Sequence, residues 1–385
     1  MHRSTGRHPG RSPQLPPHLQ NTLRASKTNR AMFSDQRKHT FPVTWALILL
    51  ALLLAIVAVY TVVDDNMPRV ESVSVVLPSM DRAFEGYTIL HISDLHGKRF
   101  GPGQQQLATL LKQRSYSAVC ITGDVLGPDG DPQPFYELLE ILDPTRPVYF
   151  IAGDSDPEPI ISEPHYSNDV FAEFITGAQN RRAIYVDAPK RITVGNRSIW
   201  IVPDTQLSLD LAAAEQSYRN QLQRDQEGGN AHLAGVKARE RVLQYQLRVL
   251  EEVHEARAEM QPGDLHIALA HHPLEADFLR TVQNWNAPDG LDSYARTLDL
   301  VLAGHYNGGQ ARLPLIGPVY VPDATLPGRG WFPGDAAVHG LTQIGGVTQF
   351  ISAGLGVSDA YPVPLRLFNG PRVALIRLTA SLVAR

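Results

Sequence analysis

The stretch "YTILHISDLHGKRFGPGQQQLATLLKQRSYSAVCITGDVLG", residues 87–127, carries the pattern that sets the fold. Its two apolar runs, 87–93 and 118–122, have the length and composition of buried strands. Between them lies "GQQQLATLLKQ", residues 103–113, which has the character of a helix. A strand, a helix and a second strand in succession are typical of an α/β protein whose sheet is largely buried.

The same alternation extends from about residue 70 to the C-terminus. Further strands are expected over 72–77, 148–152, 198–202, 266–270, 298–303, 348–353 and 373–378, with a second early helix over 135–142. A hydrophobic content of 43% suffices for a real core, and a net charge of −4 does not indicate a nucleic-acid partner. The single cysteine, Cys120, lies in the run "AVCIT", where a buried and unreactive thiol is expected.

Residues 206–261 interrupt this alternation with a segment rich in charge, Gln and Ala. Apolar residues keep helical spacing in two runs on either side of "EGGN", namely Leu211, Ala214, Tyr218 and Leu222, then Val242, Val249, Val253 and Met260. "QPGD" ends the second run. We therefore expect a helical hairpin inserted between two strands, acting either as a structural lid or as an arm that binds a partner.

The N-terminal region differs from everything after it. Residues 1–40 are basic and have no periodic apolar pattern, which predicts a disordered tail. Residues 44–63, "TWALILLALLLAIVAVYTVV", carry no charge and match the roughly 20 residues that span a bilayer. A cleaved signal peptide is the alternative, but the long leader and the missing small-x-small site favour an uncleaved signal anchor over 41–63.

Charge predicts the orientation of this anchor. Basic residues crowd its N-terminal side, whereas Asp64 and Asp65 follow it directly. The positive-inside rule then places the tail in the cytoplasm and residues 64–385 outside. The expected protein is thus a single-pass protein of the cell membrane with an extracytoplasmic domain, and a cytoplasmic domain is the alternative.

Polar residues with metal-binding side chains gather where the apolar runs end. These residues are Asp94, His96, Asp124, Asp154, Asp156, His271, His272, His305 and Asn307. In open α/β sheets, sites form outside the carboxyl ends of the strands. One such residue is more often a simple cap, but five strand ends in succession indicate a cluster that binds Mn, Fe, Zn or Mg.

The order and spacing of these motifs resemble the calcineurin-like metallophosphoesterase family. Its pattern D-x-H, GD, GNH-D/E, His and GHxH is followed here by Asp94-x-His96, Gly123-Asp124, "GDSD" (153–156), His271 and "GHYN" (304–307). The segments "GGQARLPLIGPVYVP" (308–322), "GLGVS" (354–358) and "LRLFN" (365–369) look like its membrane-anchored bacterial branch. The resemblance implies a two-sheet sandwich flanked by helices, with a centre for two divalent ions.

Carried over residue by residue, the resemblance assigns ligands to both ions. Asp94 and His96 would hold the first ion, Asp124 would bridge both, and Asp154, His271 and His305 would hold the second. Asn307 stands where the family has the last His of GHxH, so the first site should be weaker and shifted toward Mg, Mn or Ca.

The "GDSD" motif departs from the family at two positions. Asp154 replaces an amide ligand with a carboxylate, which should strengthen the second site. Ser155 replaces the histidine that is expected to protonate the leaving group, and His272 and His339 are the substitute acids that the sequence offers.

The function that the resemblance implies is a membrane-anchored phosphoesterase that hydrolyses a phosphate mono- or diester with water activated by two metal ions. Its substrate would be a lipid or a cell-envelope metabolite. Ser155 and Asn307 keep an alternative open. In that alternative, the chain is a non-catalytic member with a structural metal, and its helical hairpin binds a partner.

The orientation can be tested with reporter fusions. A reporter that is active only outside the cytoplasm, fused after Arg385, should be active because the basic tail is retained inside. Activity of a cytoplasm-only reporter at the same position would contradict the orientation.

Overall fold

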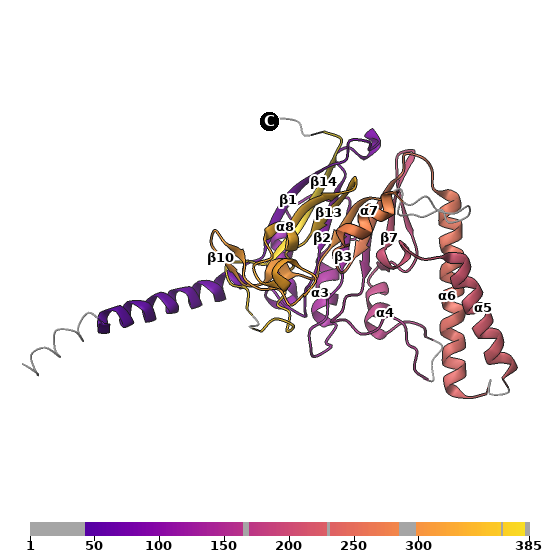
Figure 1. Ribbon diagram of the computed structural model, residues 1–385, viewed down its shortest axis with the longest axis horizontal. Helices are drawn as coiled ribbons and strands as arrows, with labels where there is room; N and C mark the ends of the chain where they lie inside the picture. The colour runs from indigo at the N-terminus through magenta and orange to yellow at the C-terminus, as the bar shows by residue number, and fades with distance from the viewer. Residues whose placement is uncertain (1–42, 165–168, 229–231, 285–297, 363–364, 382–385) are drawn as a thin grey trace, which may run out of the picture. The chain divides into compact units, whose positions relative to one another are not determined.

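The computed structural model describes residues 43–164, 169–228, 232–284, 298–362 and 365–381 (Figure 1). The described residues divide into two units between Tyr60 and Thr61. A helix over Val43–Asp65, with a mean hydropathy of 3.0, is long and apolar enough to cross a membrane. The predicted tail, residues 1–40, lies outside the described residues.

Two six-stranded sheets form the centre of the second unit. The first sheet has the order β1 (Arg69–Val76), β14 (Arg372–Thr379), β2 (Thr88–Ile92), β3 (Ala118–Thr122), β4 (Val148–Ile151) and β5 (Ala183–Tyr185). The second has the order β12 (Gly340–Ile344), β13 (Val347–Ile351), β9 (Leu298–Ala303), β8 (Leu265–Ala270), β7 (Arg197–Pro203) and β6 (Lys190–Val194). The predicted α/β fold with two sheets is confirmed.

The central strands of each sheet run parallel. β2, β3 and β4 pair in parallel with the register Ile92↔Ile121 and Thr122↔Ile151. In the second sheet, β7, β8, β9 and β13 are parallel, and Ala303 pairs with both Ala270 and Ile351. The carboxyl ends of these strands therefore meet at one edge of each sheet, which is where the predicted ligands follow.

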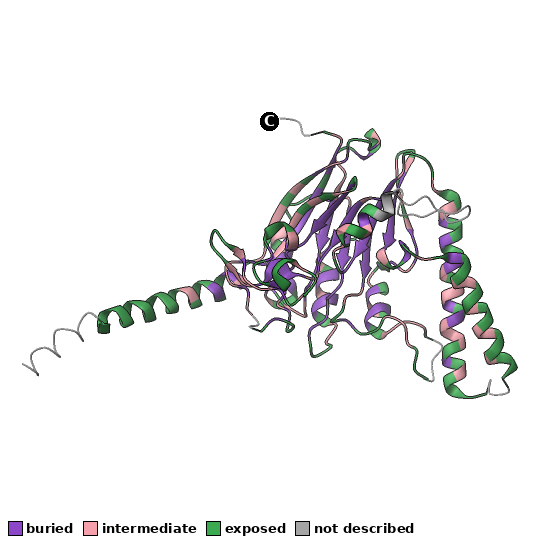
Figure 2. Cartoon of the chain, in the orientation of Figure 1, coloured by how far each residue is buried: buried purple, intermediate pink, exposed green. Residues whose placement is uncertain are grey.

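Three layers of core hold the sheets and helices together (Figure 2). Between the sheets, buried side chains such as Cys120, Tyr149, Leu302 and Phe350 face one another. The first sheet packs its other side against α2 (Gln105–Leu111), α3 (Gln133–Ile141) and α4 (Glu173–Gln179). Cys120 is fully buried, and this burial raises the pKa of its thiol, so it is the unreactive cysteine that was expected.

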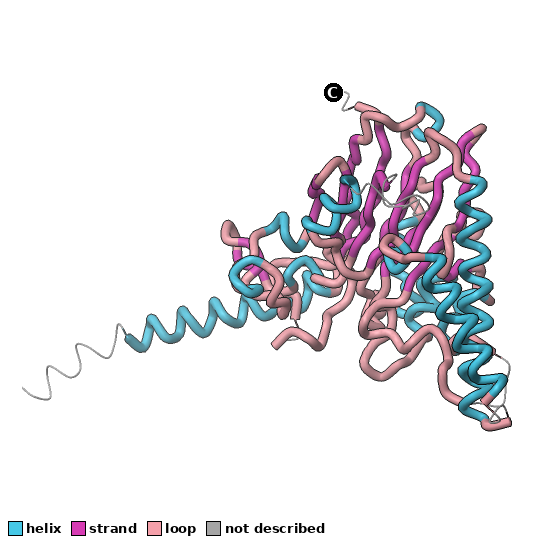
Figure 3. Tube along the Cα trace, turned by 45° about the vertical axis from the view of Figure 1, so that its right-hand side comes forward, coloured by secondary structure: helices cyan, strands magenta, loops and turns pink. Residues whose placement is uncertain are grey.

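The charged segment between β7 and β8 folds into two helices, α5 (Leu211–Glu227) and α6 (Ala234–Glu259), which lie side by side (Figures 1 and 3). The Asp210 side chain caps α5 by accepting a hydrogen bond from the Ala213 amide at 3.0 Å. Leu250 and Val253 of α6 are buried in the core of the second sheet, together with α7 (Ala276–Asn284). α6 therefore covers the sheet, while most of α5 is exposed.

Candidate metal centre

Residues from five strand ends meet in two adjoining groups. Asp94, His96 and Asp124 form the first group, and Asp154, His271, His272 and His305 form the second. Within each group, the potential ligand atoms all lie within 4.8 Å of one another. The first sheet supplies the carboxylates and His96, while the second sheet supplies the other three histidines.

Asp124 lies between the two groups. Its Oδ2 atom is 3.5 Å from His96 Nε2, and its Oδ1 atom is 3.3 Å from His271 Nε2. The Ser155 amide donates a 2.8 Å hydrogen bond to Oδ1 and fixes the carboxylate. One oxygen therefore faces each group, which is the arrangement that a bridging ligand requires.

The first group contains buried oxygens that a cation would fit. Asp94 Oδ1 accepts a 2.8 Å hydrogen bond from the His305 amide, but Asp94 Oδ2 and Asn307 Oδ1 are buried without a hydrogen-bond partner among the described residues. Asn307 Nδ2 lies 3.4 Å from His96 Nε2. A Cβ atom built on Gly354 would lie 2.9 Å from Asp94 Oδ2 and 3.3 Å from Asn307 Oδ1. Unpaired buried oxygens are costly, and oxygen-rich sets suit hard divalent cations.

The second group directs several acceptor atoms toward one region. His271 Nδ1 lies 2.9 Å from the Thr122 carbonyl, so this nitrogen donates to the carbonyl, and Nε2 is the ring nitrogen that faces Asp124 and could bind an ion. His305 Nδ1 is 3.3 Å from His271 Nε2 and 3.7 Å from Asp154 Oδ2. Two facing imidazole nitrogens between two carboxylates form a donor set that fits a divalent ion.

The electrostatics of the two ligand groups agree with this fit. Burial raises the pKa of Asp94, whose charge lacks full compensation. Burial opposes the charged form of His271, yet the contact with Asp124 raises its pKa to about 10. Burial and the neighbouring histidines lower the pKa of His305 to about 4. An ion bound here would therefore displace a proton from His271.

The backbone at the proposed ligands is strained. Asp94, His96, Asp124, His305 and Asn307 all have left-handed φ values, between 47° and 73°. Such conformations cost on the order of 1–3 kcal/mol each and cluster at functional sites. They change the direction of the chain directly after β2, β3 and β9.

Two glycines allow neighbouring strand ends to approach closely. A Cβ atom on Gly123 would lie 2.6 Å from the amide nitrogen of Gly153. A Cβ atom on Gly153 would lie 2.4 Å from the amide nitrogen of Asp124. Gly123 also has a φ of 83°. Any larger residue would push the loop of Asp124 away from that of Asp154.

Asp156 follows the same strand as Asp154 but has a different environment. It is buried, and its carboxylate accepts 2.9 Å hydrogen bonds from the amides of Val125, Leu126 and Gly153. Burial raises its pKa to about 6 despite these bonds. Asp156 therefore braces the loops after β3 and β4, and it belongs to neither ligand group.

The two histidines predicted as substitute acids lie in different places. His272 Nε2 is 2.6 Å from Asp154 Oδ2, and its half-exposed ring stacks on His305 with centroids 3.7 Å apart. His339 Nε2 lies 2.9 Å from Glu71 Oε2, and the ring of His339 packs edge-on against Phe350. The structure thus places His272 in the second ligand group and gives His339 a partner on β1.

Sequence reasoning missed Asp204 and Arg366. Asp204 follows β7 in the run "IVPD", the same signal as the other strand ends, and it lines two cavities beside His272. Arg366, in "LRLFN", is fully buried and donates to the carbonyls of Ala353, Gly356 and Asn369 at 2.6 to 2.8 Å. It holds the loop that closes over Asp94, and no sequence signal marks it for that position.

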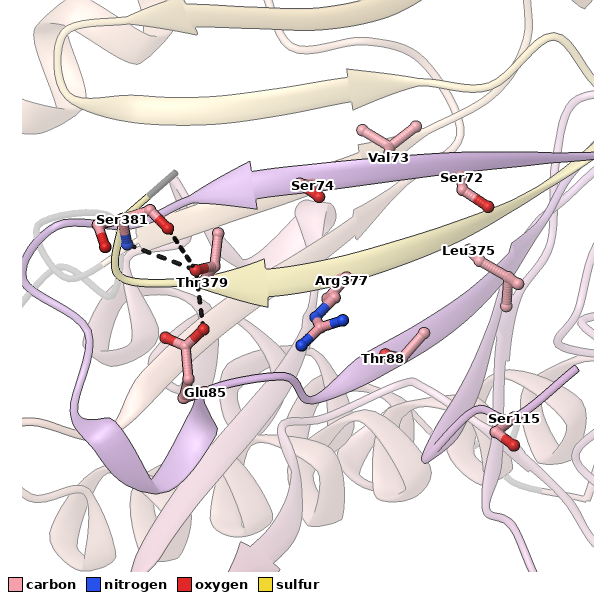
Figure 4. Close-up of a pocket in the computed structure, with 10 residues that line it drawn as sticks. All are labelled: Ser72, Val73, Ser74, Glu85, Thr88, Ser115, Leu375, Arg377, Thr379 and Ser381. Carbon is pink, nitrogen blue, oxygen red and sulfur yellow. Dashed lines mark hydrogen bonds between the residues drawn. The ribbon is translucent and has the colours of Figure 1, made fainter. Parts of the chain in front are cut away.

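The two cavities beside the second group have volumes of about 630 and 740 Å³. A further cavity of about 720 Å³ lies across β1, β14 and β2, lined by Ser72, Ser74, Thr88 and Arg377 among others (Figure 4). None of the predicted site residues lines that cavity. The candidate site is therefore at the strand ends.

Replacement of the central carboxylate tests the proposed ligand set. Asp124→Asn keeps an oxygen for the Ser155 amide but removes the charge, so bound metal should be lost and hydrolysis should fall by more than about 100-fold. Asp129 lies in an exposed turn, so Asp129→Asn should leave both the bound metal and the rate of hydrolysis unchanged. Metal analysis, phosphate release and thermal unfolding are the measurements. Similar behaviour of the two variants would show that the ligand assignment is wrong.

Removal of the Asp156 carboxylate tests its bracing role. Asp156→Ala leaves three amides without their acceptor, so the free energy of unfolding should fall by at least about 3 kcal/mol. Asp129→Ala removes one exposed hydrogen-bond acceptor and should change the free energy of unfolding by less than about 0.5 kcal/mol. Urea denaturation measures both, and equal stabilities would contradict the assignment.

Three solved structures are similar to the chain at low identity. These are the sulfate thiohydrolase SoxB of Thermus thermophilus (10% identity, TM-score 0.33), the phosphopantetheinyl hydrolase PptH of Mycobacterium tuberculosis (14%, 0.32) and a putative 5'-nucleotidase of Staphylococcus aureus (10%, 0.32). The matches cover 77%, 71% and 78% of this chain, and 57%, 91% and 56% of those chains. The comparison with curated proteins gives no match.

The sequence profile of the family described as calcineurin-like phosphoesterase matches residues 87–307. This match covers more than half of the chain and extends from β2 to Asn307, so it includes every predicted metal ligand. The chain belongs to the calcineurin-like phosphoesterase family.

Proposed function

We propose that this protein is a metal-dependent phosphoesterase, anchored in the cell membrane, that hydrolyses a phosphate mono- or diester outside the cytoplasm. The observation that carries the proposal is the position of Asp124, with one carboxylate oxygen facing each of two ligand groups. Membership of the phosphoesterase family supports the reaction class.

The proposed ligands divide between two ions. Asp94, His96 and Asn307 would hold the first, while Asp154, His271 and His305 would hold the second, and Asp124 would serve both. When bound, two divalent ions supply an activated water and a clamp for the phosphate oxygens. Asp94 and Asn307 are fully buried, whereas Asp154 is 60% exposed, so the substrate would approach from the second group.

The lining of the two cavities supports a requirement for metal. Among the described residues, neither lining includes a Lys or Arg, although Asp154, Asp204 and Asp323 contribute carboxylates. A phosphate ester entering such a cavity would be repelled by these carboxylates. Cations held by the ligand groups would offset this repulsion and attract the phosphate.

The membrane part of the proposal depends on the N-terminal helix. Val43–Asp65 is apolar and exposed, and basic residues precede it while Asp64 and Asp65 end it. This charge asymmetry supports an outward-facing catalytic unit. A phosphate ester of a lipid or another envelope component would be available to an enzyme in that position.

Ser155 sets an expectation for the leaving group. Its amide bonds to Asp124, so the exposed side chain stands beside the centre, but a hydroxyl is no general acid near neutral pH. General acids contribute about 10²–10⁴-fold, mainly when the leaving group is a strong base. The parent enzyme should therefore hydrolyse aryl phosphates far better than alkyl phosphates.

A panel of phosphate esters tests this function. Full-length protein in detergent, stripped with a chelator and reloaded with Mn, Fe, Zn or Mg, should release phosphate only when reloaded and mainly from aryl esters. Ser155→His should raise alkyl-ester turnover more than aryl-ester turnover.

Metal binding without turnover of any ester would favour the non-catalytic alternative. Equal turnover of both ester types, with chemistry rate-limiting, would require another acid, and His272→Gln and His339→Gln would then identify it.

A further inference from the structure

An apolar patch lies on two loops that the proposed chemistry does not use. The hairpin of β10 (Arg312–Leu313) and β11 (Gly317–Pro318) exposes Leu313, Leu315 and Ile316, with Leu315 fully exposed. The following loop exposes Trp331 and Phe332 by more than half. We refer to these five side chains as the apolar patch.

The two loops are attached to each other through residues 317–321. β11 pairs with β10 through Arg312↔Pro318. The Phe332 amide donates to the Val319 carbonyl at 3.0 Å, and the rings of Tyr320 and Trp331 stack at 4.7 Å. The two loops that carry the five apolar side chains are therefore held against each other.

Two residues of the patch have strained backbone conformations. The Ile316 amide donates to the Leu313 carbonyl and closes a turn, in which Leu315 has a φ of 66°. Glycine is favoured at this turn position, because a bulky side chain is strained there. Phe332 also has a left-handed φ, of 48°. Strained and exposed apolar residues on both of the connected loops indicate a contact surface.

The patch lies close to the residues at which the apolar helix ends. The Arg312 amide donates to the Leu367 carbonyl at 2.9 Å, and Phe368 lines a cavity of about 280 Å³ together with Leu315. A Cβ on Gly370 would lie 3.1 Å from Asp64 Oδ2. Phe368 and Gly370 are two residues apart, which is at most about 7 Å along the chain.

No spacer separates the apolar run from the catalytic unit. Asp64 directly follows Val63 and pairs with Arg69 at the start of β1. The Lys98 ammonium group donates to Asp65 Oδ1 at 2.7 Å, on the loop that follows His96. The edge of a bilayer that holds the apolar run would therefore lie within a few residues of Asp64 and Asp65 along the chain.

We propose that the apolar patch inserts into the interfacial layer of this bilayer. The proposal rests on the membrane anchoring proposed above, and its occupant is lipid at the boundary between headgroups and acyl chains. Trp331 and Phe332 are aromatic residues of the kind that favour this layer, and exposed Arg329 beside them suits anionic headgroups.

The docked patch would bring the candidate site near the lipid surface. The cavity of about 740 Å³ beside His305 is lined by Pro322, Asp323 and Thr325, which lie between Val321 and the Trp331 loop. A phosphate ester on an amphiphile could then reach the second ligand group while its apolar part stays in the bilayer. The substrate class that follows is an amphiphilic phosphate ester.

Depth-dependent quenching tests the docking. The only natural cysteine, Cys120, is buried, so full-length Leu315→Cys carries one reactive thiol for an environment-sensitive fluorophore. In vesicles of phosphatidylethanolamine and phosphatidylglycerol, a quencher lipid with its spin label near the headgroup should quench this fluorophore. A fluorophore at Leu233→Cys, an exposed leucine before α6, should stay bright.

The outcomes separate this proposal from the ones it rests on. If the fluorophore at position 315 stays bright in protein that resists extraction with alkaline carbonate, the docking proposal is overturned and the membrane anchor is left intact. Release by carbonate would overturn the anchor and the docking with it. Cross-linking between labelled copies without quenching would assign the patch to a second copy of the chain and overturn lipid as its occupant.

Leu315→Gly removes the side chain while relieving the strained turn, so thermal stability should stay unchanged or rise. Turnover of a lipid phosphate embedded in vesicles should fall about tenfold, the factor that corresponds to losing one buried leucine. Turnover of a soluble aryl phosphate should not change. An equal loss on both substrates would contradict a role in membrane docking.

Discussion

The Asp124 carboxylate between two imidazoles is the interaction on which the rest of the candidate site depends. It requires the end of β3 to lie within about 3.5 Å of His96, which follows β2 of the same sheet, and of His271, which follows β8 of the second sheet. Parallel central strands place these ends at one edge of each sheet. Glycines at 123 and 153 then let the two loops of the first sheet touch. The two sheets, the tight turns and the strained backbone all serve this arrangement.

Much of the fold could be predicted because its central strands are buried on both faces. All nine strands expected from apolar runs are present, from β1 to β14. Five strands were missed among the described residues. β10 and β11 have two residues each, and β5, β6 and β12 lie at sheet edges, where in β6 and β12 exposed and half-buried residues alternate without a continuous apolar run. Periodicity alone cannot recognise such strands when they are short and polar.

The site was predictable in its residues but not in their environments. Asp154 and Asp156 stand two positions apart in one polar motif, yet one is exposed beside His305 and the other is buried under three amides. Only the fold distinguishes these roles, because each depends on which neighbouring loop faces the carboxylate. Arg366 was missed for the same reason, since its three carbonyl partners come from loops that sequence reasoning does not place together.

The position of β14 has a consequence for how the chain acquires its structure. β14, near the C-terminus, lies between β1 and β2, which come first in the unit and share no edge. Until residues 372–379 have left the ribosome, β2 lacks its neighbour on one side, and the loop that carries Asp94 and His96 has no complete sheet beneath it. Contacts between distant parts of a chain form slowly. A chain of this topology would thus complete the sheet beneath its ligand centre only after its last strand had been made.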